Sequence, residues 1–254
     1  MKETVNLIYH QDKALNGNFG DELSKFITEQ LINTEKYTLV YNKQNIPLNI
    51  VCIGSYIHMA PHNSYIYGSG VRTLNNIENG HKYTNLNVAA VRGPHTRQFL
   101  LNRKINVPLT YGDPALLLRK LYTPNKILEL NDKVGIIPHK SNYKYYVNKI
   151  DMTKYELIDP TEKWNNVIDC ICSCKSIVSS SLHGLICADA FDVPNLWLDE
   201  YKLQEGDFKF KDYFASQNRN YVKITHLNQY DEALLYGEGN QINLTTLESS
   251  FPFV

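Results

Sequence analysis

The stretch KSIVSSSLHGLICADAFDVPNLWL, residues 175–198, contains a complete strand–helix–strand unit. Residues 175–181 are an apolar run that ends in three serines, and residues 193–198 are a second run of strand length. Between them, residues 183–191 have the composition of a helix. A strand, a turn of small residues and a helix in this order are typical of α/β proteins with parallel sheets. Ligands of such sheets bind beyond the carboxyl ends of the strands, so we expect functional side chains in the turns that follow the apolar runs.

The same unit recurs along the rest of the chain. We expect further strands at residues 4–10, 49–55, 65–67, 86–91, 133–139 and 155–159, and further helices at residues 22–33, 94–103 and 161–174. Residues 122–132 are polar and lack either periodicity, which predicts a linker. The prediction is an α/β fold of two Rossmann-like lobes with parallel sheets, residues 1–122 and 131–235, with a cleft between them. Residues 236–254 are expected to pack back on the first lobe.

The composition excludes several classes of protein. Of the 254 residues, 43% are hydrophobic, which is enough for a folded core. The 26 basic and 26 acidic side chains balance and form no basic cluster, so we expect no binding to nucleic acid. No apolar run approaches the roughly 20 residues of a membrane-spanning helix, and the first residues lack the pattern of a secretory signal. We therefore expect a cytoplasmic protein.

The cysteines indicate neither disulfides nor a metal site. An odd count of five without an export signal favours reduced thiols. Cys170, Cys172 and Cys174 are clustered, but on a helix Cys172 points away from the other two. Zinc sites usually pair two C-x-x-C elements, and no second element follows here. We expect core cysteines and no metal ion.

Two turns of the predicted first lobe precede helices and carry polar groups. In NFGD (18–21), Gly20 permits a tight backbone and Asp21 is expected to cap the helix. This turn is either a structural cap or a place where Asn18 and the exposed amides meet a substrate. Arg92 stands at a strand end before Gly-Pro, where its planar guanidinium either holds a phosphate or carboxylate or forms a surface ion pair.

Other turns of the first lobe favour structure over chemistry. The Gly-Ser-Gly turn at 68–70 does not continue as a dinucleotide-binding fingerprint, and the chain has no P-loop. In YGDP (111–114), Asp113 is expected to cap a short helix that has Pro114 at its first position.

The most informative turn is SSSLHG, residues 179–184. An apolar strand ends in three hydroxyl groups, and the free amides of the next helix favour an anion there. Together with the imidazole of His183 they form a candidate phosphate pocket. Serine–histidine nucleophilic catalysis is disfavoured because no G-x-S-x-G elbow occurs. His139 also ends a strand, where it is either a ligand-binding group or a packed core histidine.

As an ordered set, these turns resemble those of the polysaccharide pyruvyl transferase family, and in particular its bacterial exopolysaccharide branch. The resemblance spans about residues 15–220. The family is similar in fold to the two-lobed GT-B-type glycosyltransferases, in agreement with the predicted lobes. The segments that carry the resemblance are NFGD (18–21), GSG (68–70), VRGPHTRQFL (91–100), YGDPALLL (111–118), GIIPH (135–139), SSSLHGLICADAF (179–191) and FKFKDYF (208–214).

The resemblance implies a pyruvyl transferase of exopolysaccharide or capsule biosynthesis. Members of the family move the enolpyruvyl group of phosphoenolpyruvate onto two hydroxyls of a sugar, which yields a pyruvate ketal and free phosphate. Phosphoenolpyruvate is the donor substrate, and no cofactor is implied. The implied acceptor is a lipid-linked oligosaccharide at the inner face of the cytoplasmic membrane, where the protein would associate peripherally.

The resemblance also implies roles for single residues. The family's Arg-Leu-His segment, which grips phosphoenolpyruvate, corresponds here to Ser181, Leu182 and His183, so its arginine is missing. Lys209 or Arg219 is expected to replace that charge. The implied catalytic residues are His183, His139 and Arg92. The implied substrate-binding residues are Asn18 and Asp21 on the acceptor side, with Gly20, Ser180, Ser181, Leu182, Lys209 and Arg219.

Two alternatives stay open. A GT-B-type glycosyltransferase that uses a nucleotide sugar would have the same fold, and it would need a glutamate that binds the ribose, for which Glu200 and Glu205 are candidates. A non-catalytic sugar-binding relative is the other alternative, and the missing arginine at position 181 favours it.

Overall fold

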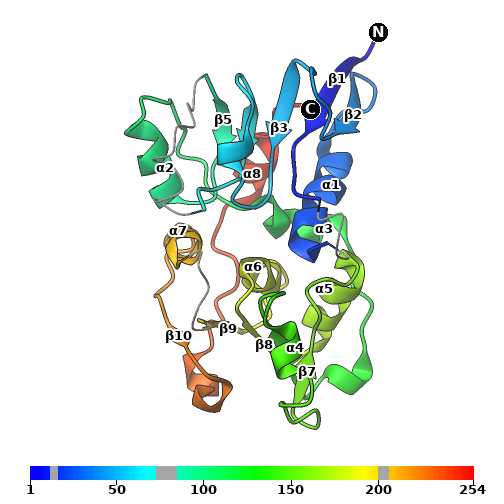
Figure 1. The fold of residues 1–254 in the computed structure, drawn as a ribbon, viewed down its shortest axis with the longest axis vertical. Coiled ribbons are helices and arrows are strands. Elements are labelled where there is room, and N and C mark those ends of the chain that lie inside the picture. The colour runs from blue at the N-terminus through cyan, green and yellow to red at the C-terminus, as the bar shows by residue number, and fades with distance from the viewer. Residues whose placement is uncertain (12–16, 73–84, 200–205) are drawn as a thin grey trace.

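The computed structural model describes residues 1–11, 17–72, 85–199 and 206–254. Two sheets, each of five parallel strands with helices between them, form two lobes (Figure 1). The predicted α/β fold with two parallel-sheet lobes is therefore confirmed.

The first lobe contains the sheet β2-β1-β3-β4-β5. Its strands are β1 (Glu3–Leu7), β2 (Tyr37–Tyr41), β3 (Leu48–Val51), β4 (Tyr65–Tyr67) and β5 (Asn87–Ala90). Its helices are α1 (Phe19–Leu31), the 3₁₀ helix η1 (Ile57–Met59) and α2 (Pro94–Leu101). The chain then continues through η3 (Pro114–Leu117), α3 (Leu118–Leu121) and η4 (Leu128–Leu130) into the second lobe.

The second lobe contains the sheet β10-β9-β8-β6-β7. Its strands are β6 (Val134–Ile137), β7 (Tyr155–Leu157), β8 (Ser176–Ser179), β9 (Asn195–Leu198) and β10 (Lys223–Ile224). Its helices are α4 (Tyr143–Tyr146), α5 (Trp164–Ser173), α6 (Leu182–Ala190) and α7 (Phe208–Ser216). The strands β6, β8 and β9 are buried along their whole length, as expected where helices cover both faces of a parallel sheet.

Both sheets reverse the direction in which strands are added. In the first, β2 pairs with one side of β1 and β3 with the other. In the second, β7 pairs with one side of β6 and β8 with the other. Such reversals open a crevice at the carboxyl ends of the strands. The turns after β1, β3, β6 and β8 are therefore where the topology places a ligand.

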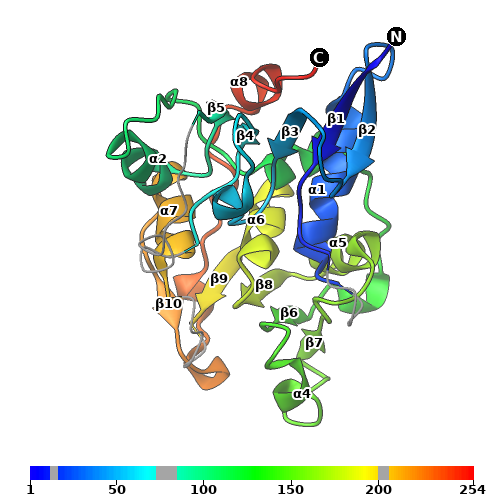
Figure 2. The ribbon, with the colours of Figure 1, turned by 45° about the horizontal axis from the view of Figure 1, so that its top comes forward.

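The end of the chain returns to the first lobe (Figure 2). After η5 (Leu227–Gln229) and η6 (Glu232–Leu234), helix α8 (Leu244–Ser249) contacts η3, and the Tyr67 hydroxyl donates to the Leu247 carbonyl at 2.9 Å. The backbone amide of Asn33 donates to the Phe253 carbonyl at 2.9 Å. The ring of Phe253 packs edge-on against Tyr37 and Tyr65.

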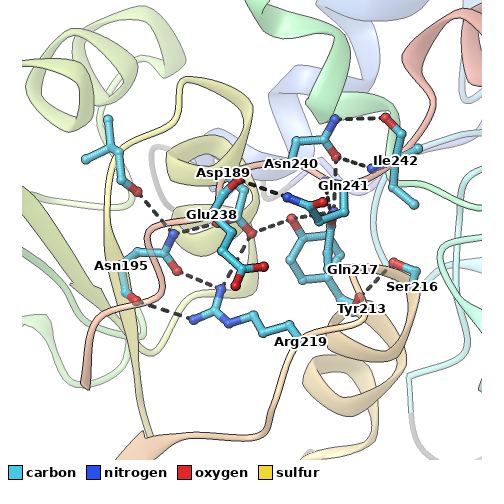
Figure 3. Close-up of polar contacts among 11 residues, drawn as sticks. Asp189, Asn195, Tyr213, Ser216, Gln217, Arg219, Glu238, Asn240, Gln241 and Ile242 are labelled. Atoms are coloured by element: carbon cyan, nitrogen blue, oxygen red, sulfur yellow. Dashed lines mark hydrogen bonds and ion pairs between the residues drawn. The ribbon is translucent and has the colours of Figure 1, made fainter. Parts of the chain in front are cut away.

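A buried polar network connects this returning segment to the second lobe (Figure 3). The Asp189 carboxylate accepts hydrogen bonds from the Asn195 amide and the Tyr213 hydroxyl, both at 2.6 Å. Arg219 donates to the Asn195 side chain at 2.8 Å and lies 3.5 Å from Asp189. The Gln217 amide donates to Asn240 at 3.2 Å. Burial raises the pKa of Asp189 to about 6, although Arg219 and the two hydrogen-bond donors oppose the shift.

Local details differ from the sequence prediction. Helix α1 begins at Phe19 because Asn18, and not Asp21, is its cap: the Asn18 side chain accepts from the Gly20 amide. Helix α5 begins at Trp164 and not at Thr161. The prediction omits β2, an edge strand without a fully buried side chain, and α7, whose aromatic residues do not follow a simple helical period. None of the helices in the described ranges is long and apolar enough to cross a membrane.

Candidate active site between the lobes

A cavity of about 810 Å³ lies between the lobes at both strand-order reversals. The first lobe lines it with the turns after β1 and β3, residues 8–11 and 54–56. The second lobe lines it with the turns after β6 and β8, residues 139–140 and 181–183. The cavity therefore lies where the topology of parallel sheets predicts a ligand.

The first turn of α1 contributes two predicted residues to the cavity wall. Asn18 lines it while its side-chain oxygen accepts from the Gly20 amide at 2.9 Å. Asp21 lines it from the same turn, and burial raises the pKa of its carboxyl group, although nearby His183 opposes the shift. Gly20 lies behind them and is absent from the lining: a Cβ there would overlap the His183 ring. In this structure Gly20 therefore packs against His183, and its predicted contact with substrate stays a prediction.

The opening of α6 faces this turn from the second lobe. Ser181, Leu182 and His183 line the cavity, and their contact with substrate stays a prediction. Ser181 is the cap residue of α6, but its side chain makes no capping hydrogen bond; its amide donates instead to the Ser179 hydroxyl at 3.0 Å. The Ser181 hydroxyl thus stands at the free amides of a helix start, where an anion is stabilised.

His139 follows β6 and is held by two serines. Its amide donates to the Ser180 hydroxyl at 2.7 Å, and its Nδ1 lies 2.8 Å from the Ser141 hydroxyl. Ser180 is fully buried and does not line the cavity, and its hydroxyl supports His139. Burial, with the charges of Lys209, Lys140 and Arg72, lowers the pKa of His139 to about 4. The ring is therefore neutral at pH 7.

A group of cations surrounds His139. Lys209, from α7, lines the cavity, and burial together with Arg92 and Arg72 lowers its pKa to about 8. Arg72 and Lys140 line the cavity as well. Sequence reasoning missed both, although each follows a strand-end turn that it had selected, GSG at 68–70 and GIIPH at 135–139. Asp21 is the one Asp or Glu side chain among the described residues that line the cavity.

Arg92 reaches the cavity wall but is already engaged inside the protein. Its side chain is fully buried, and its Nε lies 3.1 Å from the Asp212 carboxylate on α7. Its other nitrogens donate to the Ser55 hydroxyl at 2.7 Å and to the Val71 carbonyl at 2.8 Å. The surface ion pair considered from the sequence is a buried pair between the lobes. The guanidinium of Arg92 therefore connects the lobes, and its nitrogens are already engaged by protein groups.

Arg219 does not line the cavity, because Asp189 and Asn195 hold its guanidinium in the buried network of the second lobe. Of the two predicted replacements for the family arginine, only Lys209 reaches the cavity. Glu200 and Glu205, the candidates for a ribose reader, lie outside the described residues.

The first-lobe wall of the cavity is rich in aromatic rings. His10 and Tyr56 stack with centroids 5.8 Å apart and an interplanar angle of 9°, and the His58 ring also stacks with Tyr56, at 6.1 Å. Tyr9 and Tyr41 form an edge-to-face pair at 6.3 Å. All five line the cavity. Flat apolar faces with polar edges are surfaces on which the apolar face of a sugar packs while its hydroxyls find hydrogen-bond partners.

The cavity thus combines a basic side, two histidines and an aromatic wall. The cations and the α6 amides can neutralise a small molecule with more than one negative charge. A neutral His139 and a second imidazole, His183, can accept and donate protons. Within the described ranges, no group of three His, Cys, Asp or Glu side chains is arranged to hold a metal ion.

Comparison with known proteins places the chain among relatives. The family model described as polysaccharide pyruvyl transferase matches residues 13–200. An uncharacterized protein of Acanthamoeba polyphaga mimivirus is 30% identical over 205 residues, which are 78% of this chain and 70% of that protein. The segment that the family model matches includes both faces of the cavity and ends before α7.

Proposed function

The chain belongs to the polysaccharide pyruvyl transferase family, and we propose that it transfers the enolpyruvyl group of phosphoenolpyruvate to a sugar of a polysaccharide or lipid-linked oligosaccharide. The products would be a pyruvate ketal on two hydroxyls of the sugar and free phosphate. The membership itself carries the coarser statement, a transferase that acts on polysaccharide.

The charge of the cavity is the observation that supports phosphoenolpyruvate as the donor. Phosphoenolpyruvate carries a phosphate and a carboxylate. The cavity has a basic side formed by Arg72, Lys140 and Lys209, and Asp21 is the one carboxylate among its described lining residues. The low pKa values of His139 and Lys209 both arise partly from these neighbouring cations. An anion bound among them would relieve that repulsion, which favours binding.

The two histidines suit the proton transfers. The reaction begins with a proton added to the methylene carbon of phosphoenolpyruvate, which leaves an oxocarbenium-like centre at C2. One sugar hydroxyl attacks that centre and loses its proton; a second hydroxyl then displaces phosphate and closes the ketal ring. We assign the proton acceptor to His139, which its pKa of about 4 keeps neutral, and the proton donor to His183.

We assign the acceptor sugar to the first-lobe wall. There Asn18 and Asp21 supply polar groups, and the stacked rings of His10 and Tyr56 supply a flat face. A lipid-linked acceptor would bring the protein to the inner face of the cytoplasmic membrane, which is part of the proposal.

The test is phosphate release from phosphoenolpyruvate, with and without a galactose-type acceptor, and mass spectrometry of the sugar product. We expect acceptor-dependent phosphate release and a product heavier by one pyruvate less one water. A parallel thermal-shift screen compares phosphoenolpyruvate with nucleotide sugars. Stabilisation by nucleotide sugars alone would overturn the proposal in favour of the glycosyltransferase alternative, and binding without turnover would favour a non-catalytic relative.

A further inference from the structure

One buried pair of polar atoms lies between α6 and the start of η3 without a hydrogen bond. His183 Nε2, on α6 of the second lobe, lies 3.8 Å from Asp113 Oδ2, at the start of η3. Both atoms are buried, and neither has a hydrogen-bond partner among the described residues. The other carboxylate oxygen of Asp113 accepts from the Ala115 amide at 3.0 Å, which is the helix cap that the sequence predicted.

Such a pair is costly if nothing uses it. Asp113 is fully buried, and an unpaired buried polar atom destabilises a fold, more so when the group is charged. The titratable groups that interact with Asp113 from the surrounding elements include Cys52, Cys187 and Tyr213. Burial raises the pKa of each of them, so all three stay neutral near pH 7. The imidazole of His183 is therefore the natural partner of the carboxylate.

The rest of the ring is fixed by its packing. Nδ1 of His183 lies against Gly20, in the first turn of α1, where a side chain larger than hydrogen would overlap the ring. The edge of the ring also meets Phe19, with centroids 6.5 Å apart. Asp21, from the same turn, is the second carboxylate that acts on His183. The ring thus has one nitrogen directed at Asp113 and the other at the turn that lines the cavity.

We propose that Asp113 is a positioning residue for His183: its carboxylate accepts the Nε2–H bond, which fixes the tautomer of the ring and leaves Nδ1 unprotonated beside the first turn of α1. The role of His183 in proton transfer rests on the proposed function. A hydrogen bond of about 2.8 Å needs the two atoms to approach by about 1 Å. Because η3 and α6 are packed against each other, a small shift of the His183 ring completes the pair when substrate binds, as apo catalytic hydrogen bonds often tighten in the complex.

The test replaces Asp113 by asparagine. In Asp113→Asn the new side-chain oxygen can keep the Ala115 cap, so the amide nitrogen faces Nε2 and forces that nitrogen to accept. The proton then moves to Nδ1, which is the wrong tautomer for catalysis. Asp231→Asn is the matched control, since Asp231 also caps a 3₁₀ helix through an alanine amide, at 2.9 Å, but is exposed and away from the cavity.

Two readouts separate this proposal from the proposed function. In ¹⁵N NMR of the His183 ring, recorded without substrate, we expect a proton on Nε2 in the parent protein and on Nδ1 in Asp113→Asn. In turnover with phosphoenolpyruvate, we expect kcat to fall about 10²-fold or more, with KM little changed, and Asp231→Asn to behave as the parent.

Each outcome has one meaning. An Nδ1 proton in the parent protein, or an unchanged tautomer in Asp113→Asn, overturns the positioning role even if pyruvyl transfer is demonstrated. The expected tautomers without any turnover of phosphoenolpyruvate would leave the pair standing and reject the proposed function instead. Equal losses of kcat in Asp113→Asn and Asp231→Asn would reduce Asp113 to a helix cap.

Discussion

Two buried polar contacts connect distant parts of the fold, and they differ in how completely their hydrogen bonds are made. In the first, Asp212 of α7 accepts from Arg92 and from the amide and hydroxyl of Thr96, at 3.1, 2.9 and 2.6 Å. It thereby caps α2, a helix of the other lobe whose own cap residue, Gly93, offers no side chain. In the second, Asp113 and His183 face each other at 3.8 Å and lack that last hydrogen bond. We call the first contact closed because its hydrogen bonds are complete, and the second poised because one hydrogen bond is missing.

The difference separates a contact that stabilises the fold from a contact that can respond to a substrate. A buried ion pair whose hydrogen bonds are complete is held in one geometry. A buried pair that lacks a hydrogen bond can still change its geometry when a ligand binds. Helix α7 shows both behaviours within one turn: Asp212 is committed to the first lobe, while Lys209 lines the cavity. Substitutions at the two contacts should therefore differ in kind, with losses of stability at one and losses of activity at the other.

The largest expected effect is at the closed contact. In Arg92→Ala, Asp212 stays buried without its cation, and breaking a buried pair in this way costs about 3–5 kcal/mol. Urea unfolding should record that loss in the free energy of unfolding. The control is Arg119→Ala, which breaks the exposed pair with Asp192 and should cost about 1 kcal/mol or less. If Arg92→Ala unfolds like the parent but loses turnover, Arg92 acts on the substrate and the contrast between the contacts fails.

The next effect is at the poised contact. Gly20→Ala would place a methyl group in the His183 ring, so the ring must leave its present position. A displacement of about 1 Å in a reacting group can cost about 10²-fold in rate, and we expect a loss of that order in kcat. Gly237→Ala, at a glycine with nothing within 4 Å of the added carbon, should turn over normally. Full activity in Gly20→Ala would show that the position of the ring is not critical.

The sequence could predict the elements whose patterns are local. Apolar runs that end in small residues located the strands before the turns at 179–181 and 138–139, and strand-end logic then placed both turns in one cleft. The omitted elements have weaker patterns. In β2, the side chains are half-buried or exposed, so YTLVY does not form a continuous apolar run. In α7, Asp212 is a buried acidic residue in a position that a helical pattern would assign to an apolar one.

The sequence could predict where the site lies better than it could predict what each residue contacts there. Asn18, Asp21, Ser181, His183 and His139 all reach the cavity because each follows a strand or begins a helix. The partners of Arg92 and Arg219 were not predictable. Asp212 is 120 residues from Arg92, and Asn195 is 24 residues from Arg219, so only the tertiary fold shows that each guanidinium is already engaged.

The smallest expected effect concerns Lys209 of α7. It is the pH dependence of phosphoenolpyruvate binding. Lys209 has a pKa of about 8, lowered chiefly by burial and then by Arg92 and Arg72. A bound phosphate or carboxylate stabilises the ammonium form and raises that pKa. Between the two values the free protein has lost a proton that the complex retains, so affinity falls as the pH rises above 8.

At pH 9 about nine-tenths of Lys209 would be uncharged in the free protein, which should weaken phosphoenolpyruvate binding up to about tenfold relative to pH 7. The donor's own phosphate is fully ionised over this range, and His139, with its pKa of about 4, does not titrate there. Lys209→Arg is the matched variant, since a guanidinium stays charged and the affinity should become flat. Calorimetry with phosphoenolpyruvate and no acceptor, at pH 7, 8 and 9, measures both proteins. A parent protein that binds phosphoenolpyruvate equally well at all three pH values would place the anion away from Lys209. The contrast between a structural Asp212 and a ligand-binding Lys209 on α7 would then no longer hold.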